Sequence, residues 1–468
     1  MRVATAIDGA IGRMEKTVTT SIQTRTVKPP ACESRAMSDL LVSGGRVLRP
    51  DLTIERADVL IDQDSGTIQA VGDEARSAAP ADELDAGGDL VIPGLVNAHT
   101  HVAMTLLRGY ADDKPLDAWL QEDIWPVEAE FTPEDVRAGA ELGIVEMIKS
   151  GTTAFSDMYF HVPEIAAAVE DAGVRAVLGH TAVTVAKDDG GARADMQESL
   201  DVALELDGAA DGRITTTFQP HSLTTVGEEY LREFVPKARE EGLPIHFHAN
   251  ETEDEVDPLV EEHDERPLEY ADGLDLLGPD TFVAHGVHVD ESEIELLAET
   301  GTGVVHCPAS NMKLASGMAP VQDMLDAGVR VGLGTDGAAS NNDLDMFDEM
   351  RDAAMLGKLA AEDASAVDAA SVVEMATQGS ADLLGLDSGR IEAGANADLA
   401  VVDLDAPHLT PEHDLVSHLA YAARGSDVRH TICDGQVLLR DREVQVFDED
   451  AVRKRASERA RELIDRAQ

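Results

Sequence analysis

Histidine and aspartate residues recur at the ends of short apolar segments that have the composition of buried strands. The first segment ends in His-Thr-His, with His99 and His101 two residues apart. At that spacing on a strand, both side chains point to the same face and can share one metal ion. Later segments end near His248, His285 and Asp336. Three imidazoles and one carboxylate are a suitable ligand set for zinc or iron, with a position left for water.

Each of these residues could also have an ordinary structural role. A single histidine in a strand is usually a packed, hydrogen-bonded core residue, and the Gly-Thr-Asp-Gly segment at 334–337 is usually only a turn. Independent core histidines, however, have no reason to lie at the same end of successive strands. The joint pattern therefore favours a metal site.

Eight strand-like segments alternate with amphipathic stretches such as 133–151 and 227–242, which have helical apolar spacing and end at Gly. The eight segments are residues 90–101, 152–160, 175–183, 214–222, 243–251, 281–289, 301–310 and 330–337. Such alternation predicts a parallel α/β sheet, either closed or open. Because strand ends in a TIM barrel converge on one mouth where catalytic groups collect, the polar residues favour a TIM-like (β/α)8 barrel over 94–391.

The regions on either side of the predicted barrel have a different texture. Residues 37–93 and 392–468 contain short β-rich runs broken by Gly and Asp turns, and neither region is large enough to bury a core alone. We expect them to pair into one composite β-sandwich. Residues 1–36 carry six Lys or Arg against three Asp or Glu, a net charge of +3. They are interpreted as a disordered extension, or as translated sequence before a true start at Met37.

Charge and cysteine content narrow the possible partners. The chain has 91 Asp plus Glu against 37 Lys plus Arg, a net charge of −54, which disfavours nucleic acid and anionic membranes. A surface of this kind resembles that of proteins from salt-loving organisms. Cys32, Cys307 and Cys433 form neither a disulfide framework nor a CxxC site, which predicts a reducing cytoplasm. No run approaches the length of a membrane span. The sequence is compatible with a homo-oligomer.

Four segments, PGLVNAHTH, HANE, AHGVH and GTDGAASNN, resemble the signature segments of the amidohydrolase superfamily. More narrowly, they resemble the 5-methylthioadenosine/S-adenosylhomocysteine deaminase family over residues 37–468. The resemblance implies one divalent metal ion, with Zn²⁺ first and Fe²⁺, Mn²⁺ or Ni²⁺ as alternatives. The implied ligands are His99, His101, His248 and Asp336.

The resemblance also implies a reaction, the hydrolytic deamination of a 5'-modified adenosine to an inosine analogue and ammonia. In it, metal-activated water loses a proton to Asp336 and attacks the ring carbon that carries the amine. Glu251 protonates the adjacent ring nitrogen, and His285 orients the attacking oxygen and stabilises its charge as a hydrogen-bond donor. Glu128 is expected to take the ribose hydroxyls, and His221 to contact the substrate.

Two departures from related patterns refine this expectation. Members of the superfamily with two metal ions carry a lysine on the fourth strand, where this chain has Gln219 and His221, so we expect a single ion. At the end of the third strand, His180 stands where the deaminase family commonly has Arg. A His there weakens contact with the carboxylate of S-adenosylhomocysteine, because Arg supplies a bidentate fork. Methylthioadenosine is then the favoured substrate. Trp119 and Trp125 form either pocket walls or core.

Three alternatives are compatible with parts of the pattern. Other ring deaminases and chlorohydrolases, of the 5'-deoxyadenosine, guanine, cytosine or triazine type, share the metal-site segments, and only Glu128 with His221 argues against them. A non-catalytic scaffold on the same fold would not need all four ligands together with Glu251 and His285. A metal-storage protein would not need a carboxylate beside the ligands. The H-x-E with P-C-x-x-C signature of cytidine deaminases and the HExxH motif are both missing.

Overall fold

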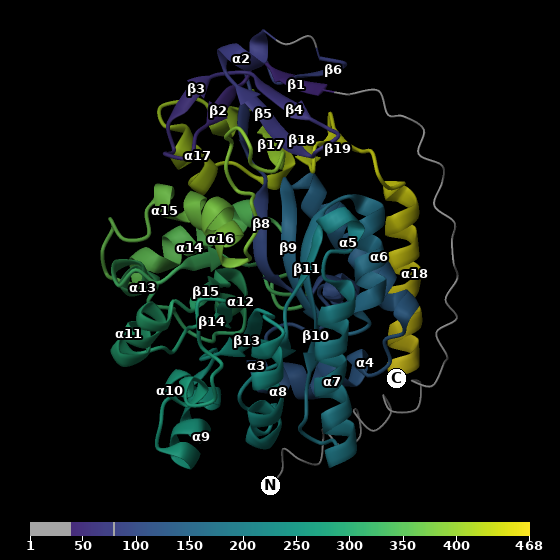
Figure 1. The fold of residues 1–468 in the computed structure, drawn as a ribbon, viewed down its shortest axis with the longest axis vertical. Helices are drawn as coiled ribbons and strands as arrows, with labels where there is room; N and C mark the ends of the chain where they lie inside the picture. Colours follow the sequence, from purple (N-terminus) through teal and green to yellow (C-terminus); the bar gives the residue numbers. More distant parts are fainter. Residues whose placement is uncertain (1–38, 78–79) are drawn as a thin grey trace.

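The computed structural model describes residues 39–77 and 80–468. Residues 1–36, where we predicted an extension or a start at Met37, lie outside the described residues. Two bodies are visible in Figure 1, a strand-rich part at the top and a larger part below in which helices lie around a central group of strands. None of the described helices is both long and apolar enough to cross a membrane.

The larger part is a TIM-like barrel of parallel strands, as predicted. Neighbouring strands pair in the orders β11-β10-β9-β8 and β13-β14-β15-β16, while β12 also pairs with β10, so that β11 and β12 share one strand position. The barrel strands are β8 (Leu95–Thr100), β9 (Thr152–Tyr159), β10 (Arg175–Ala182), β11 (Ile214–Thr216), β12 (Gln219–Pro220), β13 (Ile245–Ala249), β14 (Thr281–His285), β15 (Gly303–His306) and β16 (Val331–Leu333).

Two seams close this ring. Parallel bridges Phe218↔Ile245 and Ser222↔His248 join the two runs of strands at one seam. At the other seam, the Asp336 amide donates to the His99 carbonyl over 3.0 Å. Gly334 permits this approach, because a Cβ there would lie 2.7 Å from the His99 nitrogen. The seam therefore brings two predicted site residues from opposite ends of the barrel sequence into contact.

Helices cover the outside of the barrel, and shorter ones lie over its carboxyl end. The outer helices are α5 (Pro133–Lys149), α6 (Val162–Ala172), α7 (Asp189–Leu206), α8 (Glu228–Glu240), α10 (Pro267–Asp272), α11 (Glu291–Thr300), α13 (Val321–Asp326), α14 (Met346–Ala360), α15 (Ala369–Glu374) and α16 (Ser380–Leu383). The helix α9 (Glu253–His263) lies over the carboxyl end of the barrel. The shorter elements are η2 (Val102–Leu107), α3 (Leu116–Trp119), η3 (Leu120–Ile124), α4 (Trp125–Glu128) and α12 (Pro308–Lys313).

Aspartate side chains start many of these helices. An oxygen of each capping residue accepts a hydrogen bond from an amide in the first turn, which satisfies a donor that the helix leaves free. The negative charge also interacts favourably with the amino end of the helix. Caps of this kind are made by Asp188, Asp290, Asp345 and Asp368 in the barrel, by Asp414 at α17 (Leu415–Tyr421) and by Asp448 at α18 (Glu449–Ala467). Part of the large acidic content therefore has a structural use.

The strand-rich part is a composite β-sandwich of two sheets, with strand orders β5-β4-β1-β6 and β20-β19-β18-β17-β7-β2-β3. Strands from both ends of the chain meet where β7 pairs antiparallel with β17. The strands are β1 (Asp39–Ser43), β2 (Arg46–Leu48), β3 (Ile54–Arg56), β4 (Val59–Asp62), β5 (Thr67–Val71), β6 (Asp82–Asp85), β7 (Leu90–Pro93), β17 (Leu399–Val402), β18 (Val428–Cys433), β19 (Gln436–Arg440) and β20 (Glu443–Val444).

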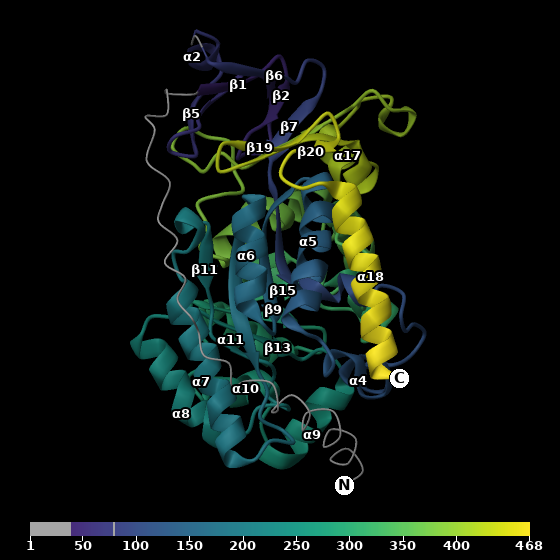
Figure 2. The same ribbon diagram turned by 90° about the vertical axis from the view of Figure 1, so that its right-hand side faces the viewer.

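The last helix, α18 (Glu449–Ala467), leaves the sandwich and runs down the side of the barrel (Figure 2). It packs along α5, and the guanidinium groups of Arg459 and Arg466 both contact the buried carboxylate of Asp135 at the start of that helix. The predicted domain division into 37–93 plus 392–468 and 94–391 stays a prediction. The helix α18 falls within the first of these units by sequence while packing on the second.

Candidate metal centre and active site

The carboxyl ends of the barrel strands bring four imidazoles and one carboxylate together. His99 and His101 come from the end of β8, and the Nε2 atoms of these two side chains lie 3.5 Å and 3.1 Å from Asp336 Oδ1. Potential ligand atoms of His99, His101 and His248 all lie within 4.8 Å of one another, and so do those of His99, His285 and Asp336. All five predicted residues are therefore in one place, although they are far apart along the chain.

Hydrogen bonds determine which nitrogen of His99 faces this centre. His246 Nδ1 lies 2.9 Å from the Phe282 carbonyl, which can only accept, so His246 Nδ1 carries the proton. His246 Nε2 is then an acceptor, and His99 Nδ1 donates to it over 2.9 Å. His99 Nε2 is left with a bare lone pair, buried and without a hydrogen-bond partner. A buried lone pair of this kind is what a metal ligand needs.

The same logic applies to two further imidazoles. His101 Nδ1 donates to the Met158 carbonyl over 2.6 Å, and His248 Nδ1 donates to the His221 carbonyl over 2.9 Å. In both rings the Nε2 lone pair remains available. Burial lowers the pKa of His101, but the adjacent Asp336 outweighs this effect and raises that pKa to about 9, so a metal ion would displace a proton from this ring on binding. Three imidazoles held in this way, together with one carboxylate, fit a divalent metal ion by number, donor type and support from neighbouring groups.

The two carboxylate oxygens of Asp336 have different partners. Oδ2 accepts hydrogen bonds from Ser310 Oγ at 2.7 Å and Ser340 Oγ at 2.8 Å, which leaves Oδ1 toward the imidazoles. Burial by itself raises the pKa of Asp336, but the adjacent imidazoles of His101 and His99 bring that pKa well below its usual value. The side chain is therefore a carboxylate, as a ligand or base must be.

Glu251 and His285 lie beside this centre. Glu251 Oε2 is 3.6 Å from His285 Nε2, and the Nδ1 of His285 donates to Asn311 Oδ1 over 3.0 Å. Burial, followed by the nearby charge of Asp336, raises the pKa of Glu251 to about 8. Glu251 therefore holds a proton at neutral pH. Burial lowers the pKa of His285, so this ring is neutral and, in this tautomer, offers a lone pair at Nε2. His285 Nε2 is therefore an acceptor, which corrects the donor role that the resemblance implied.

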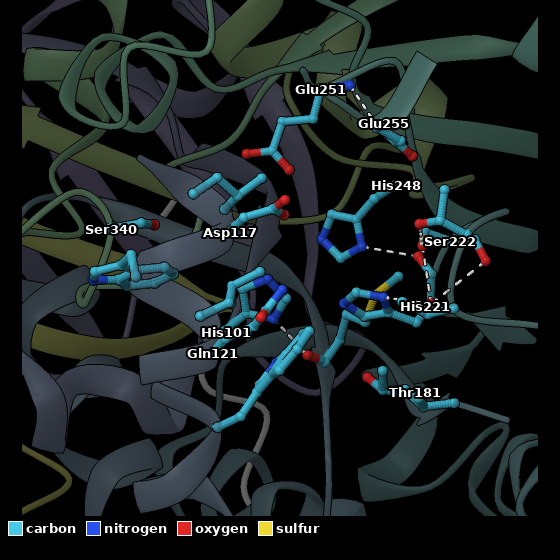
Figure 3. A pocket seen from close by; sticks show the side chains of 18 of the residues that line it. His101, Asp117, Gln121, Thr181, His221, Ser222, His248, Glu251, Glu255 and Ser340 are labelled. Carbon is cyan, nitrogen blue, oxygen red and sulfur yellow. Dashed lines mark hydrogen bonds between the residues drawn. The ribbon is translucent and has the colours of Figure 1, made fainter. Parts of the chain in front are cut away.

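A cavity of about 440 Å³ opens over the candidate centre and is lined by His101, His248, Glu251, His285 and Asp336. Figure 3 shows His101, His248 and His221 close together in its wall, with ring centroids of His248 at 5.5 Å from His101 and 4.7 Å from His221. The polar groups at the floor and the apolar residues around them give the cavity the character of a small-molecule site.

The predicted substrate contacts Glu128 and His221 both line the cavity. Tyr159 Oη donates to Glu128 Oε1 over 2.7 Å, and burial raises the pKa of Glu128 to about 7. His221 Nδ1 lies 2.9 Å from Thr225 Oγ1, and burial lowers the pKa of this imidazole to about 3, so it is neutral. Trp119 and Trp125 are wall residues of the same cavity.

Comparison with known proteins decides the family. The model of the amidohydrolase family matches residues 90–438, which is most of the chain. This chain belongs to the amidohydrolase family. The match begins in the sandwich, includes all the barrel strands, and ends after β18, so it spans both parts of the structure.

This amidohydrolase is similar to several proteins that are named as deaminases. It is 78% identical over 431 residues to a 5-methylthioadenosine/S-adenosylhomocysteine deaminase of Haloarcula marismortui, covering 92% of this chain and 100% of the relative. It is 69% identical over 432 residues to a protein of that name from Halobacterium salinarum, with coverage of 92% and 100%. A solved adenosine deaminase from Xanthomonas campestris with bound zinc is 40% identical, with a TM-score of 0.85 and coverage of 92% and 98%.

One predicted site residue of this amidohydrolase is placed apart from the others. His180 is the sixth residue of β10, but it does not belong to the lining of the cavity. His180 Nε2 instead donates to Asp195 Oδ1 on α7 over 3.2 Å. Its ring faces that of Phe160, a wall residue, with centroids 6.2 Å apart. We therefore revise its expected role from direct substrate contact to support of the wall.

Several residues that the sequence alone did not single out complete the site. His246 fixes the tautomer of His99, Ser310 and Ser340 hold Asp336, and Asn311 holds His285. For His246 a signal was present, because the segment IHFHA repeats the two-residue histidine spacing of His-Thr-His. The hydroxyl and amide side chains gave no such signal, since these residue types are common in turns.

Proposed function

We propose that this amidohydrolase deaminates 5'-modified adenosines, 5-methylthioadenosine and/or S-adenosylhomocysteine, to the corresponding inosine analogues with release of ammonia. The observation that supports this most is the meeting of the His99, His101 and His248 imidazoles with the Asp336 carboxylate, next to protonated Glu251. The names of the relatives at 78% and 69% identity point to the same substrates.

The proposed metal ligands are His99, His101, His248 and Asp336, around one divalent ion. Zinc is the first candidate, with Fe²⁺, Mn²⁺ and Ni²⁺ as alternatives for such a donor set. When bound, the ion supplies a Lewis acid that makes water nucleophilic near neutral pH. Metal analysis of the purified protein would give both identity and stoichiometry. A ratio near two ions per chain would contradict the single site.

The residues around the ion have separate tasks in the proposed reaction. Asp336 Oδ1 takes the proton of the attacking water. His285 Nε2 accepts a hydrogen bond from that water and so orients it toward the ring carbon that carries the amine. Glu251, protonated at neutral pH, delivers its proton to the adjacent ring nitrogen. The amine then leaves as ammonia after a further proton transfer, and an oxygen of water remains on the ring.

The wall of the cavity would select the nucleoside. The Glu128 carboxylate, already held by Tyr159, is proposed to accept hydrogen bonds from the ribose hydroxyls. The neutral ring of His221 contacts the substrate beside the ion, and Trp119 and Trp125 provide apolar walls. A bare purine or triazine has no ribose for Glu128, so this residue favours the nucleoside over the other ring substrates of the family.

A spectroscopic assay tests the proposal. The metal-loaded protein is incubated with methylthioadenosine, and the ultraviolet change from adenine to hypoxanthine is followed together with ammonia release. A panel of 5'-deoxyadenosine, guanine, cytosine and a chlorinated triazine serves as the comparison. We expect turnover of the 5'-modified adenosines. Ammonia or chloride release from a ring without ribose, with none from the adenosines, would reject the proposal.

The cell compartment is part of the same proposal. Cys307 and Cys433 are buried and unpaired in the described structure, which suits the reducing cytoplasm that we propose as the location. The partner is a small molecule, and the strongly acidic chain is a poor partner for nucleic acid or an anionic membrane.

A further inference from the structure

Acidic side chains outnumber basic ones in the lining of the cavity. Six acidic residues belong to this lining, namely Asp117, Glu128, Glu251, Asp254, Glu255 and Asp336. Among the described residues of this lining, Lys187 is the single lysine or arginine. A cation in such surroundings either balances a nearby carboxylate or binds an anionic part of a ligand, and its contacts distinguish these roles.

Lys187 is held in place by a group outside the lining. Its Nζ lies 2.8 Å from Asp195 Oδ2, and both side chains are 14% exposed. The same Asp195 oxygen accepts from the Val183 amide over 2.7 Å, while the other oxygen accepts from His180 Nε2. Both oxygens of Asp195 therefore have donors. An ammonium group has three N–H donors, and within the described structure Nζ contacts Asp195, so further donors remain for a ligand.

The position of Lys187 suits the 5' end of a nucleoside. It follows β10, which lies next to β9, the strand that carries the Tyr159 partner of Glu128. The Val185 amide in the same loop donates to the Thr225 carbonyl, and Thr225 contacts His221. Figure 3 shows Thr181, from the end of β10, on the same side of the cavity as His221. The loop therefore forms part of the same wall as both proposed nucleoside contacts.

We propose that Lys187 binds the carboxylate of an amino-acid-bearing 5'-substituent, with Asp195 and His180 positioning it. The proposal rests on the proposed function and names a determinant of its specificity. Lys187 takes over the carboxylate contact that His180, directed at Asp195, does not make. Substrates with an uncharged 5'-alkylthio group use the rest of the cavity and do not need Lys187.

Substitution of Lys187 with two matched substrates tests this. The variants are Lys187→Met, which removes the charge, and Lys187→Arg, which keeps it. The substrates are S-adenosylhomocysteine and its methyl ester, which lacks the negative carboxylate, with methylthioadenosine as a reporter of an intact site. For Lys187→Met we expect kcat/KM with S-adenosylhomocysteine to fall about 10- to 100-fold, mainly through KM, the range for losing one hydrogen bond between charged groups.

The other measurements separate the outcomes. With the ester and with methylthioadenosine, Lys187→Met should stay within about threefold of the wild type, and Lys187→Arg should retain most activity on S-adenosylhomocysteine. Equal losses on all three substrates, or no loss on any, would overturn the proposal. Turnover of methylthioadenosine but not S-adenosylhomocysteine by the wild type would also overturn it while leaving the proposed function standing. Turnover of neither nucleoside would reject the proposed function itself.

Discussion

At the scale of single residues, Asp336 has the most demanding position in the site. One oxygen is fixed by Ser310 and Ser340, and the other lies within 3.5 Å of two imidazole Nε2 atoms. Asparagine has nearly the same shape, but it has neither the charge nor the basicity. We expect Asp336→Asn to lower kcat/KM by about 10²- to 10⁴-fold with the fold intact. The adenine-to-hypoxanthine assay and circular dichroism measure the two effects.

The matched control for Asp336→Asn is Ser340→Ala. This variant removes one supporting hydrogen bond and keeps the carboxylate, so its loss should be clearly smaller. Substantial turnover by Asp336→Asn would mean that another group is the base.

Glu128 gives a prediction about pH. Burial raises its pKa to about 7, although the hydroxyl of Tyr159 acts in the opposite direction. Only the ionised carboxylate can accept from both ribose hydroxyls, and it gains a proton as the pH falls below that pKa. KM for the nucleoside should therefore rise by up to about tenfold per pH unit below pH 7. Initial rates between about pH 5 and 8 measure this.

Two variants check the origin of that pH dependence. Tyr159→Phe removes the donor that stabilises the carboxylate, so the pKa of Glu128 should increase and KM should begin to rise at a higher pH. Glu128→Gln should show a raised KM that does not change over the same range. A flat KM in the wild type would show that ionised Glu128 does not bind the ribose.

At the scale of elements, α18 ties the end of the chain to the barrel. Leu463 is fully buried between this helix and the barrel core. Leu463→Ala should lower the free energy of unfolding by about 2–5 kcal/mol, because a cavity replaces packed atoms. Denaturant titration measures this change. The control is Arg461→Ala on the same helix, an exposed position where we expect a change within about 0.5 kcal/mol.

A second consequence concerns the substrate site. The Arg466 guanidinium also donates to the Glu130 carbonyl over 3.2 Å, close to Glu128. Loosening of α18 should therefore raise KM for the nucleoside as well as reduce stability. Equal stability of Leu463→Ala and Arg461→Ala would mean that α18 contributes little to the folded barrel.

At the scale of the whole molecule, the net charge of −54 is expected to make stability depend on salt. Repulsion between exposed carboxylates opposes the compact state, and salt weakens it, since the screening length falls from about 10 Å at 0.1 M to about 3 Å at 1 M. We expect the thermal midpoint of unfolding to rise as KCl increases over that range. Sucrose at the same osmolarity is the control for effects of water activity. An unchanged or lower midpoint in KCl would contradict the expectation.

Much of the fold could be predicted because its signals are local. The eight apolar segments each contain barrel strand residues, and Gly or Asp marks many of the boundaries. The prediction that residues 90–101 form a single barrel strand was wrong, because this segment contains both β7 of the sandwich and β8 of the barrel. Between them lies Gly94, where a Cβ would meet Thr153 Oγ1 at 2.1 Å. A close approach of this kind depends on a distant strand and leaves no local pattern.

The sequence by itself determined the residue types of the candidate centre, because imidazoles and a carboxylate seldom recur at the ends of successive strands without a metal ion to bind. Only the tertiary structure decided which nitrogen of each ring is free, because that depends on hydrogen-bond partners such as the Phe282 and Met158 carbonyls. Every residue has a backbone carbonyl, so these partners leave no signal in the sequence. It also turned His180 toward Asp195 and placed Lys187 in the cavity wall. Hydrogen bonds between distant segments form only when the barrel closes, so residue type alone cannot fix them.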